Sequence, residues 1–349
     1  MTVLHPLVSV IVPAYNEARR IRECLDSVLA QTYTNWECIV ANNQSKDATS
    51  AIAHEYAAKD ARVRVHENTE FLPAIGNFNH ALRLMSPEAK YCKVVFADDW
   101  IYPTCIEEMV ANAEAHPSAG IVGAYALSGS VVRWAGLPYP SPLVPGRQIC
   151  RKLFLEDVYL CGAATNVLYR ADLVRKKDPF YNEANYHCDL ETAVQLLHES
   201  DFGFVHQVLS YTREEEEGCL RKTSEDLVTY IAGNYYAFNK YGRNVLTEEE
   251  FSRRTRYWRK EYYGVLAGGV LRGRGPKFWN YHKMTLAACG EILDYAYIVR
   301  ILLGKAVWAL VNPGSSIRRI LQIASERRLR IRVSQQDDGA LVHGQKPIQ

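Results

Sequence analysis

The chain has 349 residues, of which 48% are hydrophobic and 23% are charged. These values argue against a disordered protein, and this length favours one large globular domain with an additional segment. The formal net charge is only +2. It gives no global sign of nucleic-acid binding, so we expect no nucleic-acid partner.

The first hundred residues alternate between short β-branched runs and longer amphipathic runs. This alternation predicts an α/β fold with a parallel, doubly wound sheet and helices on both faces. The expected strands are 8–13, 36–41, 63–66 and 93–97, and the expected helices are 17–31, 50–58 and 75–85.

The pattern is less regular between residues 101 and 215. A loop rich in proline and glycine is expected at 136–146, and loops of this length are often functional. The other expected elements are a helix at 102–116, strands at 120–125, 161–170 and 202–211, and a helix at 188–198. After an acidic run at 214–217 the pattern turns helical, so we place a boundary near 215–225.

The longest apolar stretch, 296–311, is interrupted by Arg300, Gly304 and Lys305. It is too short and too charged for a confident membrane span, and a buried helix is the favoured interpretation. The segment that follows is basic and amphipathic, so it can lie on anionic lipid or form a solvated helix. Its apolar and basic residues are Ile317, Arg318, Arg319, Ile320, Leu321, Ala324, Arg327, Arg328, Arg330 and Arg332.

Nine dispersed cysteines, without closely spaced pairs, favour a reducing, cytoplasmic compartment. The N-terminus has no basic flank and runs directly into a strand, so we expect no signal peptide.

Asp98 and Asp99 follow the fourth expected strand. Two adjacent carboxylates repel each other, and a bound cation or ligand relieves that repulsion. Ligands of open α/β sheets collect beyond the carboxyl ends of the strands. Oxygen ligands at such a place suit Mg²⁺ or Mn²⁺ that arrives with substrate phosphates. The alternative is an ordinary turn before the next helix.

The segments 13–17 and 42–47 follow the first two expected strands. A strand, a turn and a helix N-terminus together make a pocket for an anion or a base. In the alternative interpretation Pro13 ends the strand, Asn16 caps the helix, and Glu17 favours its positive end. Asp47 can likewise cap the second helix.

Three segments, in this order, resemble the family 2 glycosyltransferases, which are inverting enzymes with the GT-A fold. They are Val-Ser-Val-Ile-Val-Pro-Ala-Tyr-Asn-Glu, Cys-Ile-Val-Ala-Asn-Asn-Gln-Ser-Lys-Asp-Ala-Thr and Val-Val-Phe-Ala-Asp-Asp-Trp. The similarity covers residues 7 to about 213. It implies a GT-A domain at 1–215, with a nucleotide half at about 1–100 and an acceptor half at about 101–215. A helical region with a basic tail follows at 216–349.

The resemblance implies transfer of a sugar from a nucleotide-diphosphate sugar to a hydroxyl acceptor, in surface polysaccharide, glycolipid or glycan synthesis. Asp98 would meet the ribose, and Asp99 would hold the Mn²⁺ or Mg²⁺ that bridges the diphosphate. The residues implied around the nucleobase and ribose are Pro13, Ala14, Tyr15 and Glu17, with Asn42 or Asn43 against the base.

The sequence departs from the family pattern at two places. It has Asn42-Asn43-Gln44-Ser45 where Asp-Asp-Gly-Ser is common. An amide still donates and accepts, so it can read a base edge without fixing which base. Phe96 replaces the first aspartate of an Asp-x-Asp-Asp string, so the expected metal site depends on Asp98 and Asp99 alone.

An inverting transfer needs a carboxylate that takes the proton of the acceptor hydroxyl. Asp189 matches the family's base, although a helix cap explains it equally well on local grounds. Glu191 is the second candidate, and His187 borders the acceptor. Thr165 lies in a segment that the resemblance places near the sugar and the acceptor. Arg213, Arg221 or Lys222 would supply positive charge to the leaving group.

Two other classes compete with the transferase. The altered Asn42-Asn43 pair and Phe96 leave room for a scaffold that binds sugar nucleotides without turnover. A nucleotidyltransferase shares the sheet type and the metal, but neither a glycine-rich phosphate loop nor a P-loop is present. We expect a cytoplasmic enzyme, with the inner face of the membrane as its alternative location. The basic C-terminal helix would make peripheral membrane contact there, and the acceptor would be lipid-linked.

Overall fold

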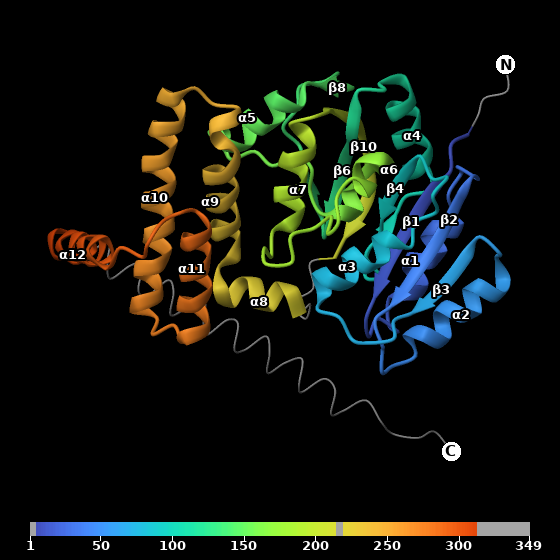
Figure 1. The fold of residues 1–349 in the computed structure, drawn as a ribbon, viewed down its shortest axis with the longest axis horizontal. Coiled ribbons are helices and arrows are strands. Elements are labelled where there is room, and N and C mark those ends of the chain that lie inside the picture. The colour runs from blue at the N-terminus through green and yellow to red at the C-terminus, as the bar shows by residue number, and fades with distance from the viewer. Residues whose placement is uncertain (1–4, 214–218, 313–349) are drawn as a thin grey trace. The chain divides into compact units, whose positions relative to one another are not determined.

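The computed structural model describes residues 5–213 and 219–312 (Figure 1). The chain divides into two compact units, Met1–Tyr262 with Gly275–Ile292, and Tyr263–Arg274 with Leu293–Gln349. The basic segment that we expect beyond residue 316 lies outside the described residues. The predicted boundary near 215–225 remains a prediction.

A ten-stranded sheet forms the centre of the first unit. Its main path runs β3-β2-β1-β4-β9-β6-β10-β5, while β7 pairs with β6 and β8 with β10. Strands β3, β2, β1 and β4 are parallel, and β9 is antiparallel to both of its neighbours. The strands are β1 Val8–Ala14, β2 Trp36–Asn42, β3 Val63–Glu67, β4 Tyr91–Val94, β5 Trp100–Ile101, β6 Ala119–Ser128, β7 Val131–Arg133, β8 Leu143–Val144, β9 Val167–Arg170 and β10 Asp201–Thr212.

Helices cover both faces of the sheet. Val8, Val10 and Val12 of β1 join the core that α1, α2 and α4 form on one face, while the intervening Ile11 faces the other side. Helices α3 and α7 pack against the sheet as well. The helices of this half are α1 Ile21–Leu29, α2 Thr49–Lys59, α3 Ala74–Arg83, α4 Cys105–Ala115, α5 Gly146–Glu156, α6 Ala171–Arg175 and α7 Cys188–Leu197. The predicted doubly wound α/β fold is confirmed.

Residues 219–312 are mainly helical, as expected. Within the first unit α9 packs against α7 and α11 (Figure 1). The helices are α8 Cys219–Leu227, α9 Thr229–Tyr241, α10 Glu248–Leu271, α11 Pro276–Ala288 and α12 Tyr295–Val311. Short 3-10 turns at Ala164–Asn166 and Gly242–Asn244 precede β9 and α10.

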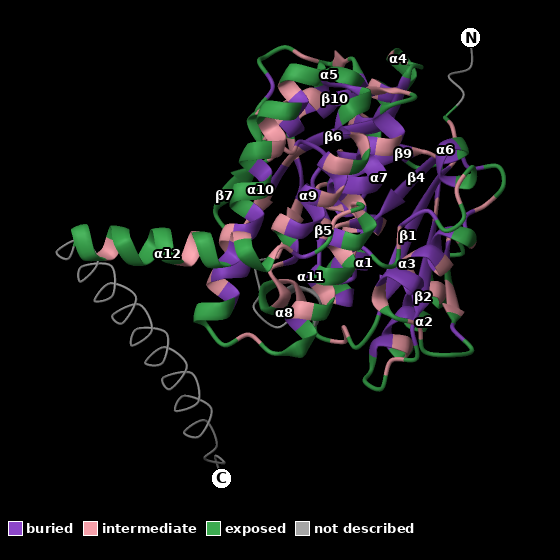
Figure 2. Ribbon diagram, turned by 60° about the vertical axis from the view of Figure 1, so that its left-hand side comes forward, coloured by how far each residue is buried: buried purple, intermediate pink, exposed green. Residues whose placement is uncertain are grey.

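The expectation of a buried helix at 296–311 is wrong. In α12 only Ile298 is buried, and Leu303, Val307 and Leu310 are each more than half exposed (Figure 2). Apolarity around a whole helix normally indicates burial, but α12 presents that surface to the outside. Within residues 5–213 and 219–312, no helix combines the length and the hydropathy needed to span a bilayer.

The fourth strand is also displaced from its expected place. We expected it at 93–97, but β4 ends at Val94. Residues 95–97 continue into a turn that the Asp99 N–H closes by donating to the Phe96 carbonyl at 2.9 Å. The acidic pair therefore lies in the turn between β4 and β5.

Candidate active site

The turns that follow β1 and β2 are joined by hydrogen bonds. Asn16 has a left-handed φ of 55°, donates its N–H to Ser45 Oγ at 3.0 Å, and accepts from the Lys46 N–H at 2.8 Å. Asp47 accepts from the Ala18 N–H at 3.0 Å. Helix α1 begins only at Ile21, so Asn16 does not cap it. These hydrogen bonds join the turns after β1 and β2 into one surface beyond the strand ends, which we call the ledge.

Tyr15 is the accessible member of the first turn. Pro13 and Ala14 are buried in β1, whereas Tyr15 is 40% exposed. Its ring meets that of Phe71, which is 55% exposed, edge-on with centroids 5.0 Å apart. These two rings offer an aromatic surface beside the ledge.

The two asparagines at the end of β2 differ in what they bind. Both polar atoms of the Asn43 side-chain amide are used. Nδ2 donates to the Leu72 carbonyl, and Oδ1 accepts from the Leu72 N–H and from Asn68. Asn42 donates to Glu67 at 2.5 Å, but its buried Oδ1 has no partner among the described residues. An unpaired buried acceptor is costly, so Asn42 is the better candidate to meet a ligand donor.

Asp98 and Asp99 have different environments. Asp99 is only 2% exposed; its Oδ2 accepts from Thr165 Oγ1 at 2.7 Å and its Oδ1 from the Arg213 N–H at 3.2 Å. Burial, followed by the charge of Asp98, raises the pKa of Asp99 to about 7. Asp98 is partly exposed, and no hydrogen bond from the described residues reaches its carboxylate.

Glu17 and Asp98 come together although 81 positions separate them in the sequence. Burial, and next the charge of Asp98, raise the pKa of Glu17, while Arg20 opposes the shift. The first turn and the acidic pair therefore share one electrostatic site, as ligand binding beyond the strand ends requires.

Lys93 of β4 is buried beneath Asp99, and it was not among the predicted site residues. Lys93 Nζ donates to the carbonyls of Thr165 at 2.6 Å and Val167 at 3.2 Å. Burial lowers the pKa of Lys93, and the charge of Asp99 opposes that shift. Because Thr165 also donates to Asp99, Lys93 fixes the residue that orients the carboxylate. A charged residue inside an apolar strand was the available signal.

Arg213 lies at the acidic pair. Its Nε donates to the Asp98 carbonyl at 2.9 Å, its guanidinium pairs with Glu23, and it lies 5.0 Å from the centre of the Trp100 ring. Trp100 in turn stacks on Tyr211 at 3.8 Å. Of the three basic residues considered, Arg213 is therefore placed beside the aspartates, and the side chain of Arg221 is not described.

Phe96 stands where the family pattern has the first aspartate of its Asp-x-Asp-Asp string. Its ring packs against Phe78 of α3 at a centroid distance of 5.0 Å. The described residues contain no group of three His, Cys, Asp or Glu side chains that could hold a metal. Mg²⁺ and Mn²⁺ commonly take one or two carboxylates and complete their shell with substrate phosphates and water. The acidic pair fits that kind of site.

Asp189 lies in the first turn of α7. His187 is the cap residue and makes no side-chain capping bond, so the alternative that Asp189 caps this helix is wrong. Burial raises the pKa of Asp189, and the nearby His187 opposes the shift. Burial also lowers the pKa of His187, whose Nε2 lies 3.0 Å from Thr229 Oγ1. A raised carboxylate pKa moves towards neutral pH, which favours a general base.

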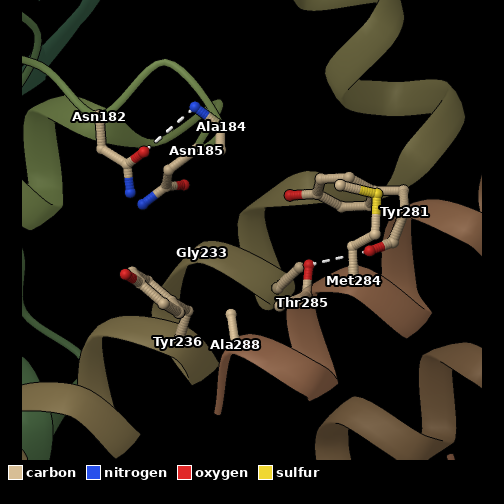
Figure 3. Close-up of a pocket in the computed structure, with 10 residues that line it drawn as sticks. Asn182, Ala184, Asn185, Gly233, Tyr236, Tyr281, Met284, Thr285 and Ala288 are labelled. Atoms are coloured by element: carbon tan, nitrogen blue, oxygen red, sulfur yellow. Dashed lines mark hydrogen bonds between the residues drawn. The ribbon is translucent and has the colours of Figure 1, made fainter.

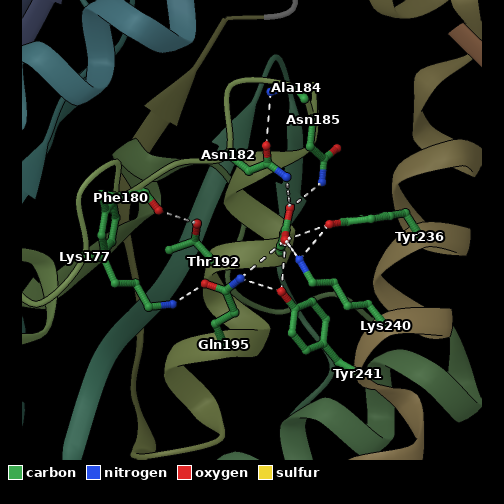
Figure 4. A network of polar contacts seen from close by, with 11 residues as sticks. Lys177, Phe180, Asn182, Ala184, Asn185, Thr192, Gln195, Tyr236, Lys240 and Tyr241 are labelled. Atoms are coloured by element: carbon green, nitrogen blue, oxygen red, sulfur yellow. Dashed lines mark hydrogen bonds and ion pairs between the residues drawn. The ribbon is translucent and has the colours of Figure 1, made fainter. Parts of the chain in front are cut away.

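Glu191, the second candidate for the base, is enclosed by six donors. Figure 4 shows these donor side chains converging from α7, α9 and the segment before α7. Glu191 is 1% exposed, and burial alone would raise its pKa, but the donors around it lower the pKa below the usual value. The donors are Asn182, Asn185, Gln195, Tyr236, Lys240 and Tyr241, at 2.9 to 3.3 Å. A carboxylate held by so many donors joins α7 to α9 and is poorly placed to accept a substrate proton.

Helix α3 connects the ledge to the segment before α7. At its start Asn77 accepts from Asn68, which also binds Asn43. In its middle Asn79 donates to the Tyr181 carbonyl and to Glu183, both at about 3 Å. The segment that leads to Asp189 is thus tied to the ledge through one rigid helix.

Comparison with known proteins identifies the class. The family model described as glycosyl transferase family 2 matches residues 9–176. The uncharacterized glycosyltransferase EpsJ of Bacillus subtilis is 26% identical over 326 residues, which cover 92% of this chain and 84% of that protein. An uncharacterized glycosyltransferase of Haemophilus influenzae is 28% identical over 240 residues, 66% of this chain and 67% of that protein. Residues 9–176 therefore form a glycosyl transferase family 2 domain, and we identify the chain as a glycosyltransferase.

Solved structures show the same fold. The crystal structure of Staphylococcus aureus TarS 1–349 in complex with UDP-GlcNAc aligns with this chain with a TM-score of 0.58 at 16% identity. The alignment covers 81% of this chain and 80% of that chain. The mannosyltransferase PcManGT from Pyrobaculum calidifontis, in complex with GDP-Man and Mn²⁺, aligns with a TM-score of 0.52 at 19% identity, covering 89% and 82%. The expected GT-A fold, with helices beyond the sheet, is confirmed.

Proposed function

We propose that the protein is an inverting, metal-dependent transferase that moves a sugar from a nucleotide-diphosphate sugar to a hydroxyl acceptor. One observation carries this proposal: Asp98, whose carboxylate accepts no hydrogen bond from residues 5–213 and 219–312, lies with Glu17 beyond the ends of β1 and β4, beside the buried Asp99. The bound nucleotide sugars of TarS and PcManGT support the donor class.

The nucleoside binds along the ledge. Tyr15 supplies a ring face for the base, and the unpaired Oδ1 of Asn42 accepts from its edge. Asn43 supports the base pocket without contacting the base, because its amide is hydrogen-bonded to Leu72 and Asn68. Pro13, Ala14 and Glu17 complete the pocket wall towards the ribose.

The acidic pair would hold Mn²⁺ or Mg²⁺ together with the diphosphate. The ion would act as a Lewis acid on the departing diphosphate. The family resemblance implies that Asp98 meets the ribose and Asp99 the metal. No described residue donates to the Asp98 carboxylate, whereas two donors hold Asp99. These environments favour a shared arrangement, in which Asp98 contacts the metal and diphosphate and Asp99 supports it from the buried side. The Arg213 guanidinium contributes positive charge beside the pair.

Asp189 takes the proton from the acceptor hydroxyl as that oxygen attacks the anomeric carbon. The proton moves from the hydroxyl to the Asp189 carboxylate, and the bond to the nucleoside diphosphate breaks on the opposite face. Burial lowers the pKa of His187 and so favours its neutral form, in which it borders the acceptor without adding a charge.

The acceptor belongs to surface polysaccharide, glycolipid or glycan synthesis, and we propose that it is lipid-linked. The large exposed apolar side chains of α12 support peripheral contact with a lipid surface at the inner face of the membrane. This contact would supplement the basic segment, in which six arginines follow α12 between residues 318 and 332.

The test is a screen of nucleotide-diphosphate sugars with Mn²⁺, Mg²⁺ and EDTA, in which release of nucleoside diphosphate is measured. We expect release that needs the metal, and a product of inverted anomeric configuration by NMR. Donor binding without release over a broad acceptor panel would favour the scaffold instead. In a parallel assay with a nucleoside triphosphate and a sugar 1-phosphate, release of pyrophosphate would favour a nucleotidyltransferase.

A further inference from the structure

A cavity of about 250 Å³ lies between the segment before α7 and helices α9 and α11 (Figure 3). The residues that line it are Asn182, Ala184, Asn185, Ala232, Gly233, Tyr236, Tyr281, Met284, Thr285 and Ala288. Ligand pockets for whole drug-sized molecules start near 300 Å³. The size therefore suits one part of a ligand.

None of the described residues that line the cavity carries a charged side chain. Its two asparagines are committed elsewhere, because both Nδ2 groups donate to Glu191 and their oxygens accept from Ala184 and His187 N–H groups. The Tyr236 hydroxyl also donates to Glu191. A sugar or a phosphate would find few free partners here, whereas a hydrocarbon would not need them.

The remaining groups of the cavity wall are mainly apolar. The Tyr236 and Tyr281 rings come from α9 and α11 and lie on either side of the cavity, with Ala288 below it (Figure 3). Met284 lies at the rim and is 69% exposed. An exposed methionine is a soft, adaptable contact for an apolar chain.

The cavity also adjoins the segment that carries the proposed base. Asn182 and Asn185 lead directly to His187 and Asp189. On the other wall Gly233 lies so close to His187 that a Cβ there would come within 2.7 Å of the His187 Cβ. A group held in the cavity therefore lies next to the residues at the acceptor side.

We propose that this cavity binds the hydrocarbon part of a lipid-linked acceptor and so positions its hydroxyl near Asp189. The assignment of the bound chain to the acceptor depends on the proposed transferase function. The preference of the cavity for a hydrocarbon does not, since it follows from the wall alone.

The experiment compares binding of hexyl and methyl β-D-glucopyranoside to the full chain by calorimetry, with hexyl glucoside below its micellar concentration. Each buried methylene contributes about fourfold in affinity. We expect hexyl glucoside to bind at least ~10-fold more tightly than methyl glucoside, because two or more methylenes fit. Equal affinities in the unaltered protein would overturn the proposal.

Two pairs of variants locate the binding. Ala288→Trp fills the cavity from an exposed helix end, and Ala287→Trp adds the same bulk at an exposed neighbour that does not line it. We expect only Ala288→Trp to reduce the hexyl preference to within ~2-fold of unity. Met284→Gln should reduce it several-fold, whereas Lys283→Gln should not. Retention of the full preference in both Ala288→Trp and Met284→Gln would place the chain elsewhere and refute the site.

Calorimetry of the same proteins with UDP-sugar or GDP-sugar and Mn²⁺ separates this proposal from the function. If donors fail to bind but the preference for hexyl glucoside is present in the unaltered protein and lost in Ala288→Trp, the transferase assignment fails and the hydrocarbon site stands. If donors bind and the hexyl preference is absent, the function stands and the hydrocarbon site fails.

Discussion

Glu191→Gln tests whether the second acidic residue of α7 is structural. The Glu191 carboxylate accepts from six side chains, and Asn182 and Asn185 share one of its oxygens. Glutamine turns one oxygen into a donor, so at least two donors lose their acceptor. Hydrogen bonds to a charged group contribute about 1.5–3 kcal/mol each. Lys240 is partly exposed and can rehydrate, so we expect a loss of about 3 kcal/mol in unfolding free energy.

The assay is urea unfolding at equilibrium, with the slope m unchanged between variants. Because donors lower the pKa of Glu191 below 4.5, its stabilisation is full above pH 4.5 and is lost as the pH falls through the folded-state pKa. The gap between wild type and Glu191→Gln should therefore shrink in acid. Glu199→Gln, at an exposed position just after α7, should stay within about 0.5 kcal/mol of wild type. A stable but inactive Glu191→Gln would refute this reasoning and restore Glu191 as a base.

Three further changes test other parts of the account. Asp98→Asn should leave the unliganded protein about as stable as wild type, yet abolish the Mn²⁺-dependent stabilisation by UDP or GDP, which reaches about 2.7 kcal/mol at 100 times Kd; persistence of that thermal shift would exclude Asp98 from the site. Gly233→Ala should destabilise by about 1–2 kcal/mol, because contact with the His187 Cβ at 2.7 Å outweighs the helical gain of alanine, whereas Gly264→Ala, with nothing within 4 Å, should stabilise. Equal effects of these two glycine changes would show that the contact is relieved without strain. Leu303→Glu should reduce co-sedimentation with anionic vesicles by at least ~10-fold relative to Ile292→Glu, an exposed change outside α12; unchanged sedimentation would argue that α12 meets another protein surface.

The parallel half of the sheet could be predicted because its strands alternate with helices in sequence. The acidic pair, Tyr15 and the Asn42-Asn43 turn could be found because each follows a strand, and in a parallel sheet such ends meet at one edge. The difference in burial between Asp98 and Asp99 could not be predicted from their place after a strand. Asp98 and Asp99 are neighbours in sequence, but only the fold brings Thr165 and the Arg213 N–H to Asp99.

Tertiary contacts also decided the features that local patterns misjudged. Asp189 looked like a cap, but α7 begins one residue earlier, at Cys188. Glu191 looked like a spare base, but α9 brings Lys240 and Tyr241 onto it from 49 and 50 positions away. The apolar run at 296–311 is helical, yet hydropathy alone did not reveal that α12 leaves its apolar side chains exposed.

The most direct test of the proposed mechanism is single-turnover sugar transfer by Asp189→Asn, once a donor and an acceptor are in hand. Loss of a general base lowers the rate by about 10²–10⁴, while nucleotide binding, measured by calorimetry with Mn²⁺, should stay within a factor of about two. Glu199→Gln serves as the control and should retain wild-type turnover. Full turnover by Asp189→Asn would contradict the assignment of the base and with it the mechanism proposed for the acceptor side.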